Sequence, residues 1–335
     1  MKKLMVATFL LLCLTLPCMA ADAVEPFLGQ WALFLPNGAG WLEVRQEQGY
    51  LDADLLWYGG SVVPVQDVYV DGETLVVTRV NRQVVKKDEK GDPTRTLTRT
   101  EWYRFMFFGD QLVGKQIRPK DNGVGVETLT FTARKTPPVG PAPDPAKLKF
   151  GKPIKLFNGV DLTGWKLLEE NAVNGWKAVD GVLLNDPVQQ EGKPRINYGN
   201  LRTTAEFEDF NIKLQVNVPA GSNSGIYLRG IYEVQVADTY GRDLDSHNMG
   251  AVYSRITPTI AAEKPAGEWQ DLDITLCDRH ITVILNGKTI IDNQPVAGVT
   301  GGAMQPCPFK AGPIYLQGDH GKVMYRNIEL RPIVK

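Results

Sequence analysis

The stretch of residues 223–238 combines ionisable side chains with the alternation of polar and apolar residues that is typical of β-strands. Successive side chains of a strand point to opposite faces, so residues of one parity share a face. The polar parity carries a guanidinium, a carboxylate and an amide, from Arg229, Glu233 and Gln235. The apolar parity consists of Ile226, Leu228, Tyr232, Val234 and Val236. A polar face of this composition is suited to the floor of a groove that binds a sugar.

A carboxylate on this face is a candidate general base, and Glu233 is the best placed. The alternative is an ion pair between Glu233 and Arg229 that only satisfies two charges. Arg229 offers a fork of donors for a sugar hydroxyl or for the negative charge of an enolate. Asp238 ends the strand on the other parity, so it is either an acid–base group at a strand end or a residue that caps a turn.

The chain has three histidines, and they differ in their predicted surroundings. His320 lies in a loop bounded by glycines between two predicted strands, and functional side chains gather in loops held by rigid strands. An imidazole with a pKa near neutrality suits proton transfer, so His320 is predicted to be an acid or a metal ligand. The alternative is an exposed turn residue. His280, at the start of a hairpin strand, is predicted to be structural.

A divalent metal ion is the one cofactor that the sequence leaves open. Asp243, Asp245 and His247 form a D-x-D-x-H pattern, and carboxylates with an imidazole suit a transition ion. The alternative for this segment is a flexible polar loop without a metal. His320 and Glu233 would be the ligands of a metal bound elsewhere in the fold, and in either case the ion would act as a Lewis acid on a ketone. No Gly-rich phosphate loop is present, so no nucleotide cofactor is expected.

The composition is that of an ordinary globular protein. The 335 residues correspond to about two domains. The hydrophobic content of 43% is enough for a buried core, and the charged content is 22%. The formal net charge of -1 gives no reason to expect binding to nucleic acid or to an anionic membrane surface.

Residues 1–20 have the pattern of a signal peptide, with Lys2 and Lys3 before an apolar run and a small-residue site before Ala21. The run is too short for a comfortable transmembrane helix, and no later stretch is long and apolar enough to span a bilayer. We therefore predict a periplasmic or secreted protein. A lipid anchor on Cys18 is the alternative.

Two cysteines, Cys277 and Cys307, remain after removal of the predicted signal peptide. In an oxidising compartment these two side chains can pair as a disulfide. The alternative is a pair of free, partly buried thiols, because sequence alone does not give the distance between them.

The first domain is predicted to span residues 26–135 and to be a small all-β unit, either a barrel or a sandwich. Short alternating runs recur between turn signals, which is typical of these architectures. The G-x-W opening at residues 29–31 resembles the start of lipocalin-like barrels. The charged segment 81–100 is predicted to be an exposed hairpin, and the proline-rich residues 136–149 a semi-rigid linker.

The second domain, residues 150–335, is also predicted to be built from strands. Alternating runs again follow one another, and Asn286-Gly287 is a strong hairpin signal. No helical periodicity of useful length is present. So many short strands in one domain predict two packed sheets, arranged as a jelly-roll sandwich.

A series of motifs covers nearly all of residues 150–335, in the order LFNGVDLTGW, NSGIYLRG, YEVQVAD, HNMGAVY, KPAGEWQ, LNG and GPIYLQGDHGKVMYRNIELRP. On these motifs the second domain resembles the DUF1080 family, the 3-keto-disaccharide hydrolase or 3-keto-glycoside lyase/hydratase domain. The resemblance implies a concanavalin A-like jelly roll. One departure is Gly318, which adds a residue to the LQDHG segment of the family.

The chemistry that this resemblance implies is an elimination. A ketone at C3 of a sugar acidifies the C2 proton, a base removes it, the aglycone leaves C1, and water adds to the enone. The reaction needs a base, a group that stabilises the enolate, and an acid for the leaving group. These roles are assigned to Glu233, Arg229 and His320, with Asp238 as a further acid–base candidate. The predicted substrate-binding residues are Gln235, Asn223, Tyr253 and Gln317.

The implied substrate is an oxidised (3-keto) glycoside or disaccharide, and the implied partner is a glycoside 3-dehydrogenase that supplies it. The rival interpretation is a non-catalytic, lectin-like carbohydrate-binding module, because sandwiches host lectins as readily as enzymes. A third is a purely structural or protein-interaction domain, which no sugar would stabilise. The pair of Glu233 and His320 discriminates between them, since a lectin has no use for proton transfer.

Overall fold

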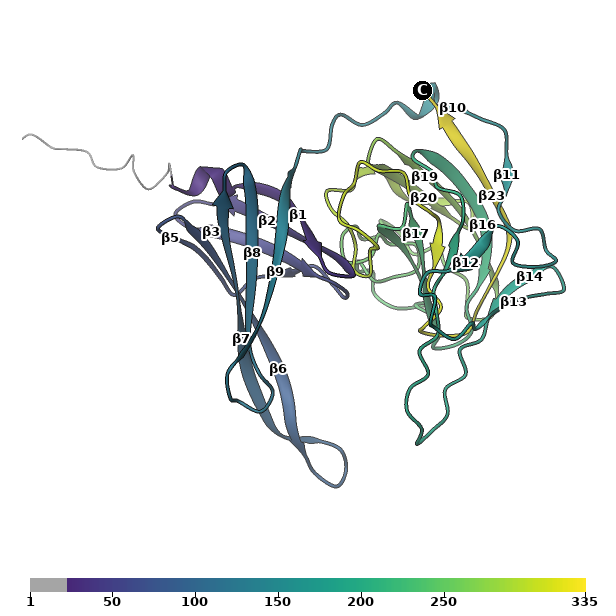
Figure 1. Cartoon of the computed structure of the whole chain (residues 1–335). Helices are drawn as coiled ribbons and strands as arrows, with labels where there is room; N and C mark the ends of the chain where they lie inside the picture. Colours follow the sequence, from purple (N-terminus) through teal and green to yellow (C-terminus); the bar gives the residue numbers. More distant parts are fainter. Residues whose placement is uncertain (1–22) are drawn as a thin grey trace, which may run out of the picture.

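The structure describes residues 23–335, as a computed structural model, and its regular secondary structure is almost entirely β-strand (Figure 1). The predicted signal peptide, residues 1–20, lies outside the described residues. The short 3₁₀ helix η1 (Glu25–Phe27) precedes the first strand, and η2 (Pro145–Lys147) lies within the linker. No helix in the described part of the chain is long and apolar enough to cross a membrane. The predicted all-β fold class is confirmed.

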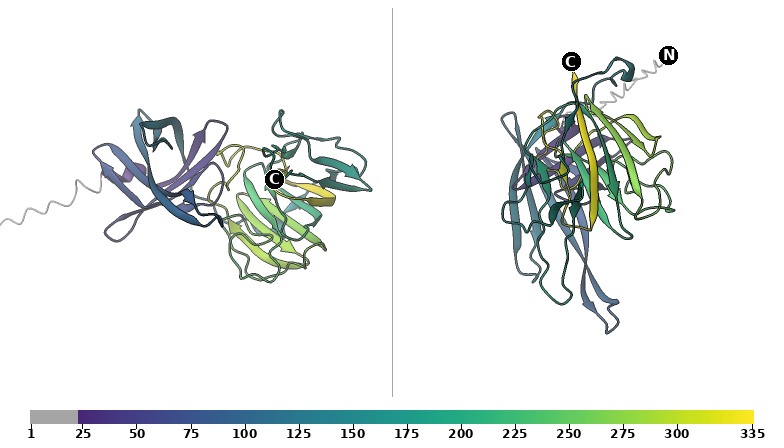
Figure 2. Two further views of the ribbon diagram at one scale, coloured as in Figure 1. Left: turned by 90° about the horizontal axis from the view of Figure 1, so that it is seen from below. Right: turned by 90° about the vertical axis from the view of Figure 1, so that its right-hand side faces the viewer.

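The N-terminal half is one antiparallel sheet in the order β4-β3-β2-β1-β9-β8-β7-β6-β5. Its strands are β1 (Gly29–Leu35), β2 (Gly38–Gln46), β3 (Leu51–Trp57), β4 (Val63–Pro64), β5 (Asp67–Asp71), β6 (Thr74–Lys87), β7 (Pro93–Phe108), β8 (Gln111–Pro119) and β9 (Val126–Thr136). The sheet curls around its own core (Figure 2). The end strands β4 and β5 do not pair with each other, so this unit is a half-barrel.

The G-x-W segment anchors the start of this sheet. Trp31 is 3% exposed, and its ring nitrogen donates a hydrogen bond of 2.8 Å to the carbonyl of Phe27. Strands β6 and β7 continue beyond the sheet as a long hairpin (Figure 1). Most side chains of the hairpin tip are exposed, as expected for the charged segment 81–100.

The C-terminal half is a sandwich of two sheets. The larger has the order β13-β14-β23-β16-β19-β20-β21, with β10 and β11 also on β23, and the smaller has the order β12-β15-β22-β17-β18. The strands of the larger sheet are β10 (Lys149–Phe150), β11 (Ile154–Lys155), β13 (Trp176–Val179), β14 (Val182–Asn185), β16 (Phe210–Asn217), β19 (Trp269–Cys277), β20 (His280–Leu285), β21 (Lys288–Pro295) and β23 (Val323–Val334). Those of the smaller sheet are β12 (Trp165–Leu167), β15 (Leu201–Thr203), β17 (Asn223–Leu228), β18 (Tyr232–Ala237) and β22 (Tyr315–Leu316).

The apolar parity of residues 223–238 lies in the core of this sandwich. Ile226, Val234 and Val236 are fully buried in the main hydrophobic cluster, which is shared with β16, β19 and β23. Because neighbouring strand residues alternate in direction, the other parity of β17 and β18 faces away from this core. The jelly-roll prediction is thereby confirmed, and its smaller sheet presents a polar outer face.

The two halves pack against each other. Ala39, Trp41 and Leu56 of the N-terminal sheet belong to the same hydrophobic cluster as the C-terminal sandwich. The guanidinium of Arg255 lies 4.3 Å from the centre of the Trp41 ring. The linker is also attached, since Arg279 donates a 2.9 Å hydrogen bond to the carbonyl of Pro137. The linker thus runs along the sandwich and does not hang free (Figure 1).

Cys277 and Cys307 are both free thiols in the structure, which decides between the two alternatives that the sequence left open. Cys277 is buried at the end of β19, where its sulfur lies 3.9 Å from a carboxylate oxygen of Asp209. Cys307 lies in the long loop between β21 and β22. The alternative of two unpaired, at least partly buried thiols is the one that the structure supports.

Candidate functional site

A polar cavity of about 420 Å³ lies on the outer face of the smaller sheet. Six of the residues nominated from the sequence line it, namely Glu233, Gln235, Asn223, Tyr253, Gln317 and His320. Other lining residues include Glu169, Asn200, Tyr227, Met304, Tyr315 and Asp319. The strands β17, β18 and β22 supply the floor, and the loops that follow β21 and β22 supply the walls.

Glu233 lies on the floor of this cavity and is only 4% exposed. It pairs with Tyr227 across the β17–β18 hairpin, while the neighbouring Gly225 pairs with Gln235. A side chain at position 225 would collide with the Glu233 carboxylate. Gly225 therefore provides the space in which the carboxylate folds over the adjacent strand.

Burial raises the pKa of Glu233 to about 8, although its hydrogen bond with Tyr227 acts in the opposite direction. The hydroxyl of Tyr227 lies 2.8 Å from Oε2 of Glu233 and 2.7 Å from the carbonyl of Gly301. A phenol has one proton, so it donates to only one of these two acceptors at a time. When Tyr227 donates to Glu233, it stabilises the carboxylate, which is why this contact lowers the pKa.

The second tyrosine of the floor is Tyr315. Its ring is stacked on that of Tyr227, with centroids 3.9 Å apart and an angle of 9° between the planes. Both rings are buried, and burial raises the pKa of each well above that of free tyrosine. Neither tyrosine was nominated from the sequence. Tyr227 could have been nominated because it lies directly opposite Glu233 in the hairpin, but this inference requires the register of the two strands.

His320 lies in the wall above Glu233. Its Nδ1 is 2.6 Å from Oδ1 of Asp319, and this hydrogen bond raises the pKa of the imidazole. The inserted Gly318 fits between the Gly199 carbonyl and the Trp176 ring, where any side chain would collide. The extra residue is therefore accommodated by close packing, and His320 still lines the cavity.

The remaining lining groups offer hydrogen bonds to a polar ligand. The side-chain oxygen of Asn223 is buried and has no hydrogen-bond partner in the described part of the chain. The side-chain oxygen of Gln235 accepts from the amide of Val236, which directs its NH₂ group away from that contact. Asn200 is held by Glu169, whose two oxygens accept 2.9 Å bonds from its backbone and side-chain nitrogens.

The structure does not bring Arg229 into the cavity, contrary to the sequence-based expectation. Arg229 has a φ of 55° and lies in the turn between β17 and β18, so the strand alternation ends before it. Its guanidinium donates to the carbonyls of Pro308 and Lys310, at 2.6–2.9 Å. Arg229 therefore holds the loop after β21, and the nominated ion pair with Glu233 is absent among the described salt bridges.

Asp238 is also placed outside the cavity. Its Oδ2 accepts a 2.8 Å hydrogen bond from the amide of Gly221, which fits the turn-capping alternative. The nominated metal ligand His247 is likewise elsewhere, because its Nε2 is hydrogen-bonded to the hydroxyl of Ser61 in the N-terminal half. Of the three metal candidates, only Glu233 and His320 share the cavity. Of the two metal sites that the sequence left open, the pattern of Asp243, Asp245 and His247 does not line the cavity, whereas Glu233 and His320 do. No chemical step is assigned to an ion.

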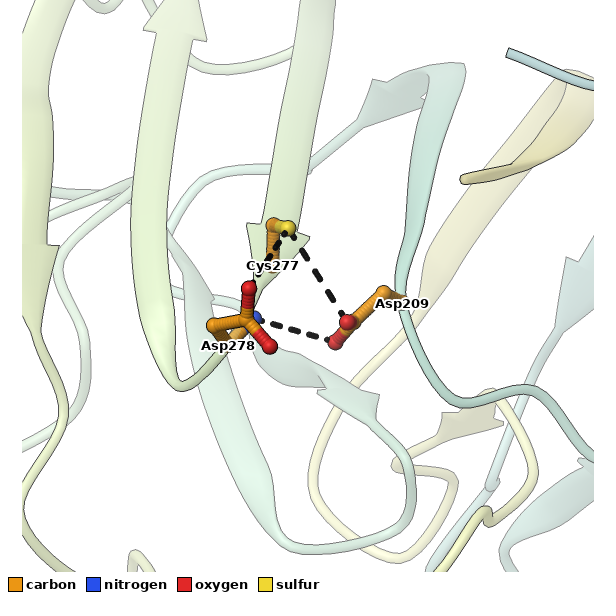
Figure 3. A group of neighbouring side chains, drawn as sticks. All are labelled: Asp209, Cys277 and Asp278. Carbon is orange, nitrogen blue, oxygen red and sulfur yellow. Dashed lines mark hydrogen bonds between the residues drawn. The ribbon is translucent and has the colours of Figure 1, made fainter. Parts of the chain in front are cut away.

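The one group of three metal-ligating side chains that the described residues bring within 4.8 Å is Asp209, Cys277 and Asp278 (Figure 3). It lies at the end of β19, away from the cavity. The ammonium of Lys335 is 2.7 Å from Asp209 and 2.6 Å from Asp278. This cation already balances the carboxylates, so the cluster is explained as an ion-pair network.

Part of the cavity wall comes from the N-terminal half, which the sequence did not indicate. Asn37, Gly59 and Gly60 line the cavity together with Gly301–Met304, and Gly60 packs directly against Gly301. Asn37 lies in the turn between β1 and β2, and the two glycines follow β3.

Comparison with known proteins assigns the C-terminal half. The sequence profile of the 3-keto-alpha-glucoside-1,2-lyase-like domain matches residues 152–331. Among curated proteins, none matches the chain. A crystal structure from Parabacteroides distasonis ATCC 8503, provisionally described as a glycosyl hydrolase, is 29% identical and covers 58% of this chain and 94% of its own, with a TM-score of 0.45. A second such structure from the same organism is 26% identical and covers 54% of this chain and all of its own, with a TM-score of 0.42.

Proposed function

Because the chain belongs to the 3-keto-alpha-glucoside-1,2-lyase-like family, we propose that it cleaves 3-keto-glycosides by elimination and subsequent hydration. The observation that carries this proposal is that one polar cavity holds both the buried carboxyl of Glu233 and the imidazole of His320. The raised pKa of His320 favours the protonated form of this imidazole. A buried acid and a neighbouring base with perturbed pKa values are typical of proton-transfer sites.

In the first step Glu233, as the carboxylate, takes the proton from C2 of the oxidised sugar. The electron pair of the C–H bond passes to the ketone as an enolate. It then returns to form the C1–C2 double bond while the bond from C1 to the aglycone oxygen breaks. His320 as the imidazolium gives its proton to that oxygen. Water then adds to C1 and C2 is reprotonated, which yields the free 3-keto sugar.

The surroundings of the two groups suit these roles. A carboxylate with a pKa near 8 is a stronger base than an ordinary glutamate, because burial penalises its charge. Asp319 favours the charged form of His320, which is the form that acts as an acid. The enolate oxygen needs a donor other than Arg229, and we assign this role to the NH₂ group of Gln235.

Hydrolysis of an unoxidised glycoside fits the cavity less well. That reaction uses two carboxyl groups at a fixed separation across the glycosidic bond. Besides Glu233, the lining carboxylates are Glu169 and Asp319. Glu169 is engaged by Asn200 and Asp319 by His320, so both have positioning roles already.

The proposed substrate also fits the predicted route of the protein. We propose that the chain is exported to the periplasm or secreted, on the basis of the signal peptide predicted at residues 1–20. We also propose that a dehydrogenase that oxidises the C3 hydroxyl of glycosides supplies its substrate, because a 3-keto-glycoside is the oxidation product of that hydroxyl.

The decisive experiment measures release of the aglycone from a 3-keto-glucoside and from its unoxidised parent. Cleavage of the keto form alone is expected, and Glu233→Gln is the matched inactive control. A chelator arm is included, in which loss of cleavage would assign the stabilisation of the enolate to a bound ion. Cleavage of neither compound, with thermal stabilisation by sugar retained, would leave a carbohydrate-binding module.

A further inference from the structure

A loop of the C-terminal half, residues 299–302, lies between the catalytic floor and the N-terminal half. On the side of the floor, the backbone amide of Glu233 donates to the Thr300 hydroxyl at 2.8 Å. The carbonyl of Gly301 accepts from Tyr227 at 2.7 Å. The loop therefore fixes both the backbone of the proposed base and the hydrogen-bond partner of its carboxyl.

On its other side the same loop is held by the N-terminal half. The amide of Gly302 donates to the carbonyl of Tyr58 at 3.0 Å. Gly301 packs so closely on Gly60 that a side chain at 301 would collide with the Gly60 backbone. These two glycine backbones touch directly. A shift of the segment around Gly60 must therefore move the loop of residues 299–302 with it.

A second hold on the loop passes through Arg255. Its Nε donates to the carbonyl of Val299 at 2.7 Å, and its guanidinium lies over the ring of Trp41. Trp41 is 4% exposed and also packs on Gly298, where an added side chain would collide with the ring. The N-terminal sheet thus contacts this loop at both ends.

We propose that the N-terminal half contributes to the active site in two ways. Tyr58, Gly60 and Trp41 position the loop of residues 299–302, which in turn holds Glu233. Asn37 contacts the substrate. Only the kinetic test of this inference rests on the proposed function. The substrate class that it implies is a glycoside large enough to reach from the floor to the N-terminal wall, with hydroxyl groups that a carboxamide can bind.

The first test compares Gly301→Ala with Gly140→Ala in the full-length chain. Neither glycine has a positive φ, so alanine strains neither backbone. The new methyl group meets the Gly60 backbone at position 301 and open space at position 140. We expect Gly301→Ala to lower kcat by about tenfold or more with little change in KM, because small displacements of reacting groups are costly. Equal kcat values for the two variants would overturn the proposal.

Trp41→Phe is a second variant for the case in which Gly301→Ala does not fold. The ring nitrogen of Trp41 is buried without a partner in the described part of the chain, so its removal forfeits no hydrogen bond. The smaller ring loosens the contact with Arg255, and a smaller fall of kcat is expected. A kcat equal to that of the unaltered protein would count against the proposal.

Amide hydrogen exchange provides a readout that requires no reaction. The amides of Gly302 and Glu233 bond to Tyr58 and Thr300, so both should exchange faster in Gly301→Ala than in Gly140→Ala. If the unaltered chain cleaves no 3-keto-glycoside, the proposed function fails while this comparison still tests the positioning. Unchanged exchange at both amides would refute it.

The role of Asn37 is tested by Asn37→Gly against Asp180→Gly. Both residues have positive φ values, of 58° and 50°, so glycine is compatible with each backbone. Asp180 lies in the exposed turn between β13 and β14 and does not line the cavity. We expect KM to rise about threefold for Asn37→Gly alone, with kcat unchanged, as for the loss of one hydrogen bond. Equal KM values would exclude Asn37 from substrate binding.

Discussion

The hydroxyl of Tyr227 lies 2.8 Å from the carboxyl of Glu233, directly across the hairpin of β17 and β18. This contact connects the proposed base to the Gly301 carbonyl and, through that loop, to the N-terminal half. The tyrosine lowers the pKa that burial raises, so the two residues together set the pH at which the carboxylate becomes available.

Removal of this hydroxyl by Tyr227→Phe is expected to raise the pKa of Glu233 further above about 8, because a hydrogen bond to the carboxylate is lost. The activity at pH 7 should fall, by about tenfold for each pKa unit of the rise, since one pKa unit is tenfold in the ionised fraction. The measurement is kcat/KM against pH, in which the ascending limb should move to higher pH. A limb that stays in place would show that Tyr227 has no part in this equilibrium.

The pH dependence of the unaltered protein follows from the same groups. Burial raises the pKa of Glu233 to about 8, and Asp319 raises that of His320. The active form needs an ionised Glu233 and a protonated His320, so the profile of kcat/KM should be bell-shaped, with activity lost as Glu233 becomes protonated below about pH 8. Tyr227, Tyr315 and the groups just named face the carboxyl. A flat profile between pH 6 and 8, measured with a 3-keto-glucoside, would contradict the assignment.

Glu233→Gln should make the protein more stable in alkaline solution. The folded chain holds the Glu233 proton up to about pH 8, whereas the unfolded chain loses it above the ordinary value of 4.5. Between these values the unfolded state binds fewer protons, so the stability of the unaltered protein falls as pH rises. Glutamine removes this loss, which we estimate at roughly 2–4 kcal/mol by pH 8. Urea unfolding of both proteins at pH 5 and pH 8 measures this loss. The prediction is refuted if the free energies of unfolding of the two proteins differ by the same amount at both pH values.

Asp319→Asn should weaken the proposed acid. The hydrogen bond that the imidazole of His320 donates to Asp319 is the main cause of the raised pKa of His320, so its loss lowers that pKa and the imidazolium fraction at pH 7.5. Aglycones that need protonation, such as alcohols or sugars, should be released more slowly, while a nitrophenolate should be affected little. The ratio of the two rates is the measurement. An equal fall in the release rates of both aglycones would show that Asp319 and His320 have a role other than protonation of the leaving group.

Arg229→Gln should act on stability and leave catalysis intact. The guanidinium is 3% exposed and donates to the carbonyls of Pro308 and Lys310, which would lose their partners. The expected cost is about 2–3 kcal/mol in the free energy of unfolding, with kcat unchanged for the folded protein. A hundredfold fall of kcat at unchanged stability would instead restore Arg229 as the group that stabilises the enolate.

Much of the site was accessible from local sequence. The alternation in residues 232–237 placed Glu233 and Gln235 on one face and Val234 and Val236 on the other, because a strand fixes the direction of each side chain. The same rule failed for Arg229, since β17 ends at Leu228 and Arg229 has a positive φ in the turn that follows. Local periodicity predicts direction only as far as the strand continues.

Contacts between distant residues were decided by the tertiary structure alone. The stacking of Tyr227 on Tyr315 and the contact of Gly60 with Gly301 join positions far apart in the chain. The sequence by itself determined two all-β units, a proline-rich linker and the faces of the central hairpin. Only the packing of the sheets decided that the N-terminal half completes the cavity, because nothing in the pattern of either half records which surface of the other it will meet.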